Sequence, residues 1–371
     1  MKAFFGRLRA DVGRFDSEQR LLLLTAVSIF LPYVLCAVVL AAATLRALLI
    51  RSLRQQMFAQ PGARWVFVFA LLNFFSPLYF KNLPGVACYF GALLLMCYLL
   101  YCRVVMTPRL FQCIADAAGF MSMCCAVVAR LQKITPAYRS MSVFMNANYY
   151  GMIIEFMVLL CLYRLLLNNG NRFYLIAIIL MNLYGLKMAD CQSAWFCIAF
   201  GALLLLCLTR HFRIAAAVAA VGAVGLLLFY SKLTILMPRL WAADSNLAIR
   251  AGIWQAGWKG FLQSPLFGRG MMGYMQLWQQ YGSQPNYHCH QLALDLLCSY
   301  GAVGSIPLVA FVARRLRVFW RKNGAPLIWT LTAVVLLHGL VDVTIAWVQT
   351  GALAAVFLAL PDGAMQQEAS R

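Results

Sequence analysis

Two histidines, His288 and His290, are separated by a single residue. They are followed by Gln291 and by a long apolar run that predicts a helix over 292–312. A histidine at the start of a helix lies near the positive end of the helix dipole, which disfavours imidazolium and keeps the ring neutral near pH 7. A neutral imidazole can accept a proton from a hydroxyl group. We therefore predict that His290 is a general base and that His288 is a secondary candidate. The plainer interpretation is a polar side chain at a membrane boundary.

A metal site is a third interpretation of this histidine pair. Zinc sites combine histidines with cysteine or carboxylate ligands in a defined spacing. Histidines at i and i+2, with no Cys, Asp or Glu placed to complete the set, do not match that pattern. We therefore predict no metal.

The second chemical candidate is an arginine on a predicted helix over 247–262. At about 100° per residue, Arg250 shares one face with several aromatic side chains, while Lys259 lies opposite. Tryptophans on one face suit a helix at a membrane surface. Arg250 is then either a clamp on a substrate phosphate, for which a planar guanidinium is suited, or an interfacial contact to lipid phosphates. The predicted face consists of Leu247, Arg250, Trp254, Trp258 and Phe261.

A turn with a third arginine follows this helix, in the segment 264–270. Pro265 ends the helix, and Gly268 and Gly270 permit a tight turn. Arg269 between the two glycines is either a second phosphate contact or a solvated turn residue.

Two more ionisable residues lie four positions apart in a late apolar run, His338 and Asp342. On one face of a helix they can hydrogen-bond to each other. An ionisable residue within a membrane span is either functional or part of a polar pair that ties helices together. Glu155 lies in the middle of another apolar run, and the sequence identifies no partner for it.

The composition indicates the elements that carry these residues. Of the 371 residues, 63% are hydrophobic and 11% are charged, whereas soluble domains carry about 25% charged residues. The apolar runs recur from Leu21 to Leu360, and several approach the ~20 residues that span a bilayer. Pro32 interrupts the first run and predicts a break there, and a cytoplasmic loop is predicted after that run from Arg46, Arg51, Arg54 and Arg64. Alternating strand patterns are absent. We predict an all-α integral membrane protein with about twelve transmembrane helices.

The basic residues predict the topology. The net charge is +20, but most arginines lie at the ends of apolar runs, which indicates the positive-inside rule and not nucleic-acid binding. We predict a multi-pass protein of the cytoplasmic membrane with both termini inside. The predicted segments are a cytoplasmic start (1–20), transmembrane helices (21–230), an extracytoplasmic catalytic loop (231–290), further transmembrane helices (291–361) and a cytoplasmic tail (362–371).

The long outer loop opposes the charge rule, because it holds five basic residues that need a separate reason. A loop of this length between membrane helices is usually functional. The five residues are Lys232, Arg239, Arg250, Lys259 and Arg269.

Several short motifs occur in order between residues 146 and 304. They are Asn146-Ala147-Asn148, Cys191-Gln192-Ser193-Ala194-Trp195, Arg250-x-x-x-Trp254, the segment Ser264 to Gly270, His288-Cys289-His290-Gln291, and Tyr300-Gly301-Ala302-Val303-Gly304.

In order and spacing these motifs resemble the O-antigen ligase / O-antigen polymerase family. That family shows N-P-N, S-R-[GS]-A-W, an arginine and tryptophan, a P-x-x-G-x-G turn, H-x-H-N and a G-x-x-G helix. The resemblance implies a C-type membrane glycosyltransferase fold. It also implies transfer of a glycan from a polyprenyl-diphosphate carrier to an acceptor hydroxyl, outside the cytoplasm, without a nucleotide sugar, cofactor or metal.

Three positions depart from the family pattern: Ala147, Gln192 and Gln291 replace its proline, arginine and asparagine. The arginine matters most, because the resemblance implies that Gln192 lies where a contact to the diphosphate is expected. Lys187 could supply the missing charge. Asn148, in the N-P-N-like motif, is a further candidate.

The expected mechanism follows from the charges. Cations at Arg250, with Arg269 or Lys187, would stabilise the diphosphate leaving group while His290 takes the proton of the acceptor hydroxyl. The expected partners are the lipid-linked glycan, a glycan or glycolipid acceptor and membrane lipids. The alternatives are a lipid-linked oligosaccharide flippase or transporter and a structural or sensor protein. Ligase and polymerase activities stay open, since they differ only in the acceptor.

Overall fold

A computed structural model describes residues 6, 10–135, 137–229, 243–321 and 324–365. Every regular element in these ranges is a helix, which confirms the predicted all-α class. The predicted loop start at 231–242, with Lys232 and Arg239, lies outside the described residues, as do most of 1–9 and the tail from 366. The α-helices are α2 (Ser17–Ser28), α3 (Tyr33–Leu49), α4 (Arg51–Phe58), α5 (Arg64–Asn73), α6 (Phe75–Tyr79), α7 (Leu83–Val105), α8 (Pro108–Gln132), α9 (Ala147–Leu166), α10 (Arg172–Ala189), α11 (Gln192–Leu208), α12 (Phe212–Phe229), α15 (Ala243–Gln263), α16 (Leu292–Val318), α17 (Ala325–His338) and α18 (Val348–Leu358).

Many of these helices are apolar enough for a bilayer. In the described part of the chain, α7, α8, α9, α10 and α16 are long enough to cross a membrane, and α3 with α4 makes a sixth candidate that bends by 96°. Shorter apolar helices at α5–α6, α11, α12, α17 and α18 complete the set. This architecture agrees with a polytopic membrane protein, and the count of about twelve spans stays a prediction. The α4 helix is a correction, because the sequence predicts a cytoplasmic loop there.

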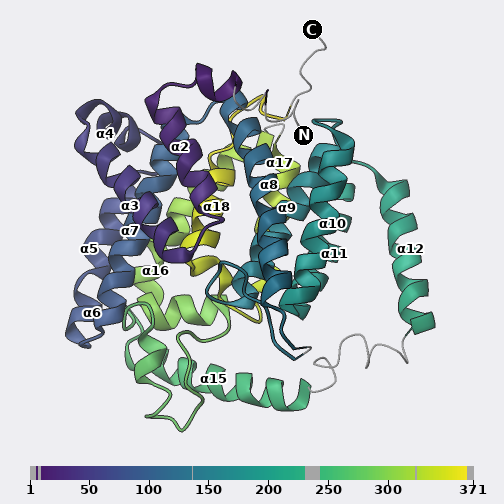
Figure 1. Cartoon of the computed structure of the whole chain (residues 1–371). Helices are drawn as coiled ribbons and strands as arrows, with labels where there is room; N and C mark the ends of the chain where they lie inside the picture. The colour runs from purple at the N-terminus through teal and green to yellow at the C-terminus, as the bar shows by residue number, and fades with distance from the viewer. Residues whose placement is uncertain (1–5, 7–9, 136, 230–242, 322–323, 366–371) are drawn as a thin grey trace.

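Helix α9 forms the centre of the bundle. It packs against α8, α10, α11 and α17, and most of its side chains are buried, Glu155 among them. Its first turn, with Asn148, lies at the end of the bundle that α15 crosses (Figure 1).

The predicted break at Pro32 is present between α2 and α3. A helix break inside a bilayer leaves carbonyl groups without partners, and these must be satisfied within the protein. The amide of Gln349 in α18 donates to the carbonyls of Ile29 and Leu31, both at 2.8 Å. A buried side chain far along the sequence therefore stabilises this break.

The two ends of the described chain lie together. Arg109, at the start of α8, pairs with Asp11, and Gln112 donates to the carbonyl of Ala364 at 3.2 Å. Figure 1 shows α15 across the opposite end of the bundle. This arrangement is compatible with two termini on one side of a membrane and the long loop on the other.

The described part of the long loop has a small core of its own. Helix α15 spans the predicted helix, but the side that it buries is not the predicted aromatic face. Ile253 and Ala256 are buried against the loop and α16, whereas Trp258 is 50% exposed. The small residues Gly257 and Gly260 lie on the buried side, against Cys289 and Leu277. Close packing of small residues decides the orientation of this helix, and this was not visible from hydrophobic periodicity.

The turn at 264–270 docks onto a break in α16. Gly301 has φ 67° and interrupts the helix, and the exposed backbone groups pair with the turn: Ala302 N–H donates to Pro265 O at 2.8 Å, and Gly270 N–H donates to Ser299 O at 2.7 Å. A Cβ on Gly301 would lie 2.3 Å from the carbonyl carbon of Leu266. The glycines are therefore required for two backbones to touch.

This contact gives a prediction for stability. Gly301→Ala should lower the unfolding temperature of the purified protein in detergent, because it combines a left-handed backbone, which costs about 1–3 kcal/mol, with a steric clash. Gly91→Ala is the matched control, since a Cβ at this helical position meets open space. Equal melting temperatures for the two variants would show that the break tolerates a side chain.

Candidate functional site

Three distant segments meet at the end of the bundle that α15 crosses. His290 precedes α16, Asp342 follows α17, and Asn148 lies in the first turn of α9. The His290 ring donates from Nδ1 to Asp342 Oδ1 at 2.9 Å, and the Asn148 amide donates to Asp342 Oδ2. The structure thus brings together three of the residues that the sequence predicted separately.

The hydrogen bonds of His290 select one tautomer. Nδ1 carries the proton that Asp342 accepts, so Nε2 has a free electron pair, which accepts a bond from the Asn286 amide. The backbone of His290 has φ 50°, a left-handed conformation that a side-chain-bearing residue adopts only when its surroundings impose it. Trp254 of α15 donates to the His290 carbonyl at 3.4 Å and helps to impose it. The ring is therefore held as an oriented base.

The Asp342 carboxylate is 2% exposed. Burial raises the pKa of a carboxyl group, but at Asp342 the hydrogen bond from His290 and the nearby histidines His288, His290 and His338 outweigh burial and hold the pKa below its usual range. The backbone N–H of Val343 adds a bond at 2.8 Å. Asp342 is therefore a carboxylate at neutral pH and can stabilise a positive charge on His290.

His288 lies beside the pair formed by His290 and Asp342, but its ring is held by different contacts. Its Nε2 is 3.6 Å from Asp342 Oδ1, and its Nδ1 accepts from the His290 N–H at 3.2 Å. Burial lowers the pKa of His288, which favours the neutral ring.

The sequence-based argument against a metal used a wrong premise. Asp342 does supply a carboxylate to the two histidines, and ligand atoms of His288, His290 and Asp342 all lie within 4.8 Å of one another. Of these atoms, His290 Nδ1 and Asp342 Oδ1 are hydrogen-bonded to each other. The sequence argument therefore no longer supports the prediction that the site binds no metal.

Arg139 extends the site and was missed by the sequence analysis. It lies in the connection between α8 and α9, where its guanidinium donates to the side-chain oxygen of Asn148 and, at 3.3 Å, to the carbonyl of Ala189. A chain of hydrogen bonds therefore runs from Arg139 through Asn148 and Asp342 to His290. Its position nine residues before Asn148, in an outer connection, was the available signal.

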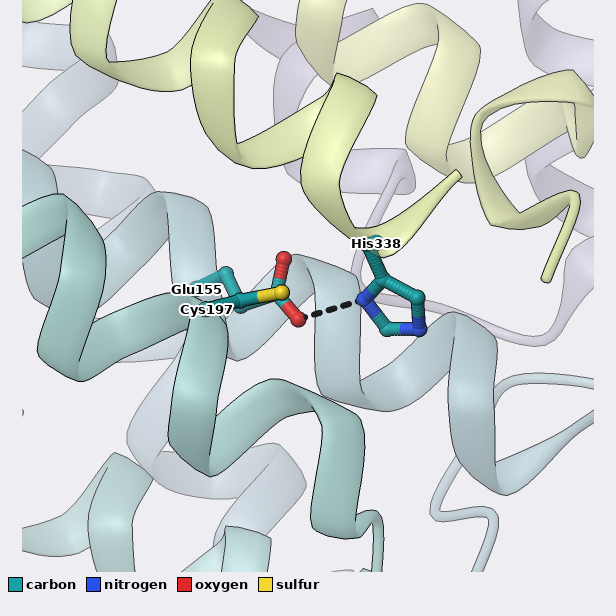
Figure 2. Close-up of side chains that lie close together, drawn as sticks. All are labelled: Glu155, Cys197 and His338. Carbon is teal, nitrogen blue, oxygen red and sulfur yellow. Dashed lines mark hydrogen bonds and ion pairs between the residues drawn. The ribbon is translucent and has the colours of Figure 1, made fainter. Parts of the chain in front are cut away.

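A second polar group lies next to the first. His338 and Glu155 are fully buried, and the His338 ring bonds to Glu155 Oε1 at 2.6 Å through Nδ1 and to Ser193 Oγ at 3.1 Å through Nε2. Figure 2 shows the Glu155 carboxylate facing this ring, with Cys197 alongside. The expected side-chain hydrogen bond between His338 and Asp342 is not formed, because Glu155 and Ser193 engage both ring nitrogens of His338; only the Asp342 backbone N–H donates to the His338 carbonyl, at 3.0 Å. Glu155, for which no partner was identified, has one.

The predicted cations are not equivalent. Arg250 is half-buried one turn before Trp254, whose indole donates to the His290 carbonyl. Lys187 is exposed in the last turn of α10. Arg269 turns instead to Gln263 and lies 4.6 Å over the ring of Phe80. Of these three, Arg250 therefore lies one turn from a residue that contacts His290.

The structure shows the contacts of two of the positions that depart from the motif pattern, Gln192 and Gln291. Gln192 is the first residue of α11, beside Ser193, and its amide nitrogen is buried without a hydrogen-bond partner among the described residues. Gln291 caps α16, because its side-chain oxygen accepts from the Leu294 N–H at 2.5 Å. An asparagine at this position could cap the helix in the same way.

Comparison with known families gives a match to part of the chain. Residues 175–309 match the model of the O-antigen ligase family. The match confirms the predicted resemblance and includes Arg250 and His290, while Arg139, Asn148 and Asp342 lie outside it. It implies glycan transfer of the O-antigen ligase kind in cell-surface polysaccharide synthesis, with a lipid-linked glycan donor and a glycolipid acceptor in the membrane. The search of curated proteins found no match.

Proposed function

We propose that this protein transfers a glycan from a polyprenyl-diphosphate carrier to a hydroxyl group of an acceptor on the outer side of the cytoplasmic membrane. The observation that carries the proposal is the oriented pair His290–Asp342 in a chain with an O-antigen ligase match. We further propose a C-type glycosyltransferase fold with about twelve spans and both termini in the cytoplasm. The charge distribution of the sequence supports that orientation.

The proposed reaction is a single displacement. His290 Nε2 takes the proton of the acceptor hydroxyl while its oxygen forms a bond to the anomeric carbon of the donor sugar. The bond from that carbon to the carrier diphosphate breaks, and the diphosphate leaves with the electron pair. The configuration at the anomeric carbon inverts, and no ATP is needed, because the glycosyl-phosphate bond already stores the energy.

The hydrogen bond from Asn286 suggests how the base is kept ready. Its amide lies at His290 Nε2, where the acceptor hydroxyl must bind. Asp342 stabilises the imidazolium that forms, as a carboxylate orients the base of a catalytic triad. Asn286 therefore has to give up its bond when the acceptor enters.

The leaving group needs positive charge. Preorganised cations stabilise charge that develops in a transition state far better than mobile water does. Arg250 is the first candidate to bind the diphosphate, and the exposed Lys187 can reach outward from the end of α10. The contacts of Arg269 with Gln263 and Phe80 favour a structural role for it over the predicted phosphate contact.

The histidines give the first functional prediction. His290→Ala should cut turnover by about 10²–10⁴-fold, the usual contribution of a general base, and should leave binding of the donor lipid intact. His288→Ala is the neighbouring control and should reduce turnover less. A purified-protein assay with polyprenyl-diphosphate-linked glycan, without ATP, measures both. If His288→Ala abolishes turnover and His290→Ala does not, the base is the other histidine. Movement of intact lipid between leaflets without any product would instead support a flippase.

The cations give a second prediction. Arg250→Ala should weaken transfer more than Lys259→Ala, because Arg250 is half-buried near the histidines, whereas Lys259 is exposed with its ammonium 5.2 Å from the Tyr281 ring. Loss of a charge-assisted contact costs about 1.5–3 kcal/mol, or roughly 10- to 100-fold in rate. The measurement is kcat/KM for the donor, and equal small losses in both variants would contradict a specific diphosphate contact.

A further inference from the structure

A cavity lies beside the histidine pair, and neither the family match nor the proposed reaction assigns an occupant to it. It is bordered by the loop before α16, the start of α9 and the segment between α17 and α18. Its polar and aromatic lining consists of Asn146, Tyr149, Tyr287, His288, Asp295 and Trp347, and methionine, valine and alanine side chains complete the wall.

The aromatic side of the cavity is a stacked pair. The rings of Tyr149 and Trp347 are 5.2 Å apart and inclined by 16°, and the ring of Tyr33 supports Trp347 at 5.6 Å. The indole Nε1–H of Trp347 is buried and has no hydrogen-bond partner among the described residues. The rings of Tyr149 and Trp347 both belong to the lining of the cavity and form its aromatic wall.

The polar side faces the catalytic base. The ring centroids of His288 and His290 are 4.6 Å apart in an edge-to-face contact. The neighbouring wall residue Val343 follows Asp342 directly in the chain. A ligand in the cavity would therefore lie next to the group that is to accept the acceptor's proton.

Rings on one wall and hydrogen-bonding groups on the others match a pyranose, which has an apolar C–H face and a rim of hydroxyl groups. The lining contains no lysine or arginine, so it does not suit the diphosphate of the donor. We propose that this cavity is the subsite for the acceptor sugar ring, with the aromatic pair Tyr149 and Trp347 as the stacking platform. This inference rests on the proposed function, because it takes His290 as the base.

The test uses two substitutions at one position. Trp347→Ala removes the platform, so the KM for the acceptor should rise roughly three- to tenfold, as expected for a lost stacking contact. Trp347→Phe keeps an aromatic platform and should raise that KM less. The KM for the polyprenyl-diphosphate donor should not change in either variant. Trp320→Phe is the control, since Trp320 is exposed at the far end of α16.

Kinetics with the donor lipid and acceptor glycolipid isolated from the native membrane give the decisive outcomes. An unchanged acceptor KM in both Trp347 variants, with His290→Ala still inactive, overturns the subsite and leaves the proposed function standing. A raised donor KM with an unchanged acceptor KM overturns it too, because the sugar in the cavity is then the donor's. A melting temperature equal to that of the wild type excludes misfolding of Trp347→Phe as the cause.

A binding measurement separates the two proposals if the wild-type protein shows no transfer. Saturation-transfer NMR with the oligosaccharide released from the acceptor by mild acid should show contact with the wild-type protein and a loss of contact in Trp347→Ala. The absence of wild-type binding at millimolar sugar would overturn the subsite. Binding without transfer would support the subsite and contradict the transferase.

Discussion

A single buried carboxylate holds together the end of the bundle that α15 crosses. Asp342 accepts hydrogen bonds from the His290 ring, the Asn148 amide and the N–H of Val343. A charge removed from water is costly unless it is paired and hydrogen-bonded. The segments around residues 148, 290 and 342 can therefore meet only if they supply those donors together. The orientation of the base and the ionisation of Asp342 follow from the same set of bonds.

The backbone around the site is irregular, and each irregularity is compensated. The break in α16 at Gly301 pairs with the turn before it, and the strained backbone of His290 is held by Trp254 and by its own ring. Breaks at membrane depth are tolerated where other parts of the protein satisfy the freed groups. The motif glycines thus act at a distance from the chemistry, by docking the 264–270 turn on α16, the helix that His290 precedes.

The sequence predicted the helical class and the break at Pro32, and it singled out His290 and Asn148 as separate candidates, because hydropathy and motif order are local signals. Pairings between distant segments were not predictable from such signals. Nothing near Glu155 in the chain indicates His338, and nothing near Asn148 indicates Arg139 beyond its presence in the same loop. The side of α15 that packs on the protein was not predicted, because the tryptophans indicated only which face suits a membrane surface, whereas Gly257 and Gly260 decide which side packs. The expected side-chain pair of His338 with Asp342 does not form, because Glu155 and Ser193, distant in sequence, engage both ring nitrogens of His338.

The account makes one claim that a single variant can test. If Asp342 fixes the tautomer of His290 and stabilises its charged form, Asp342→Asn keeps the shape of the site and removes both effects. Transfer by the purified variant from polyprenyl-diphosphate-linked glycan, measured at saturating substrates, should then fall by roughly 10²–10⁴-fold, while its affinity for the donor and its melting temperature stay close to the wild type. Turnover near the wild-type rate in a folded Asp342→Asn protein would contradict the central role of this carboxylate.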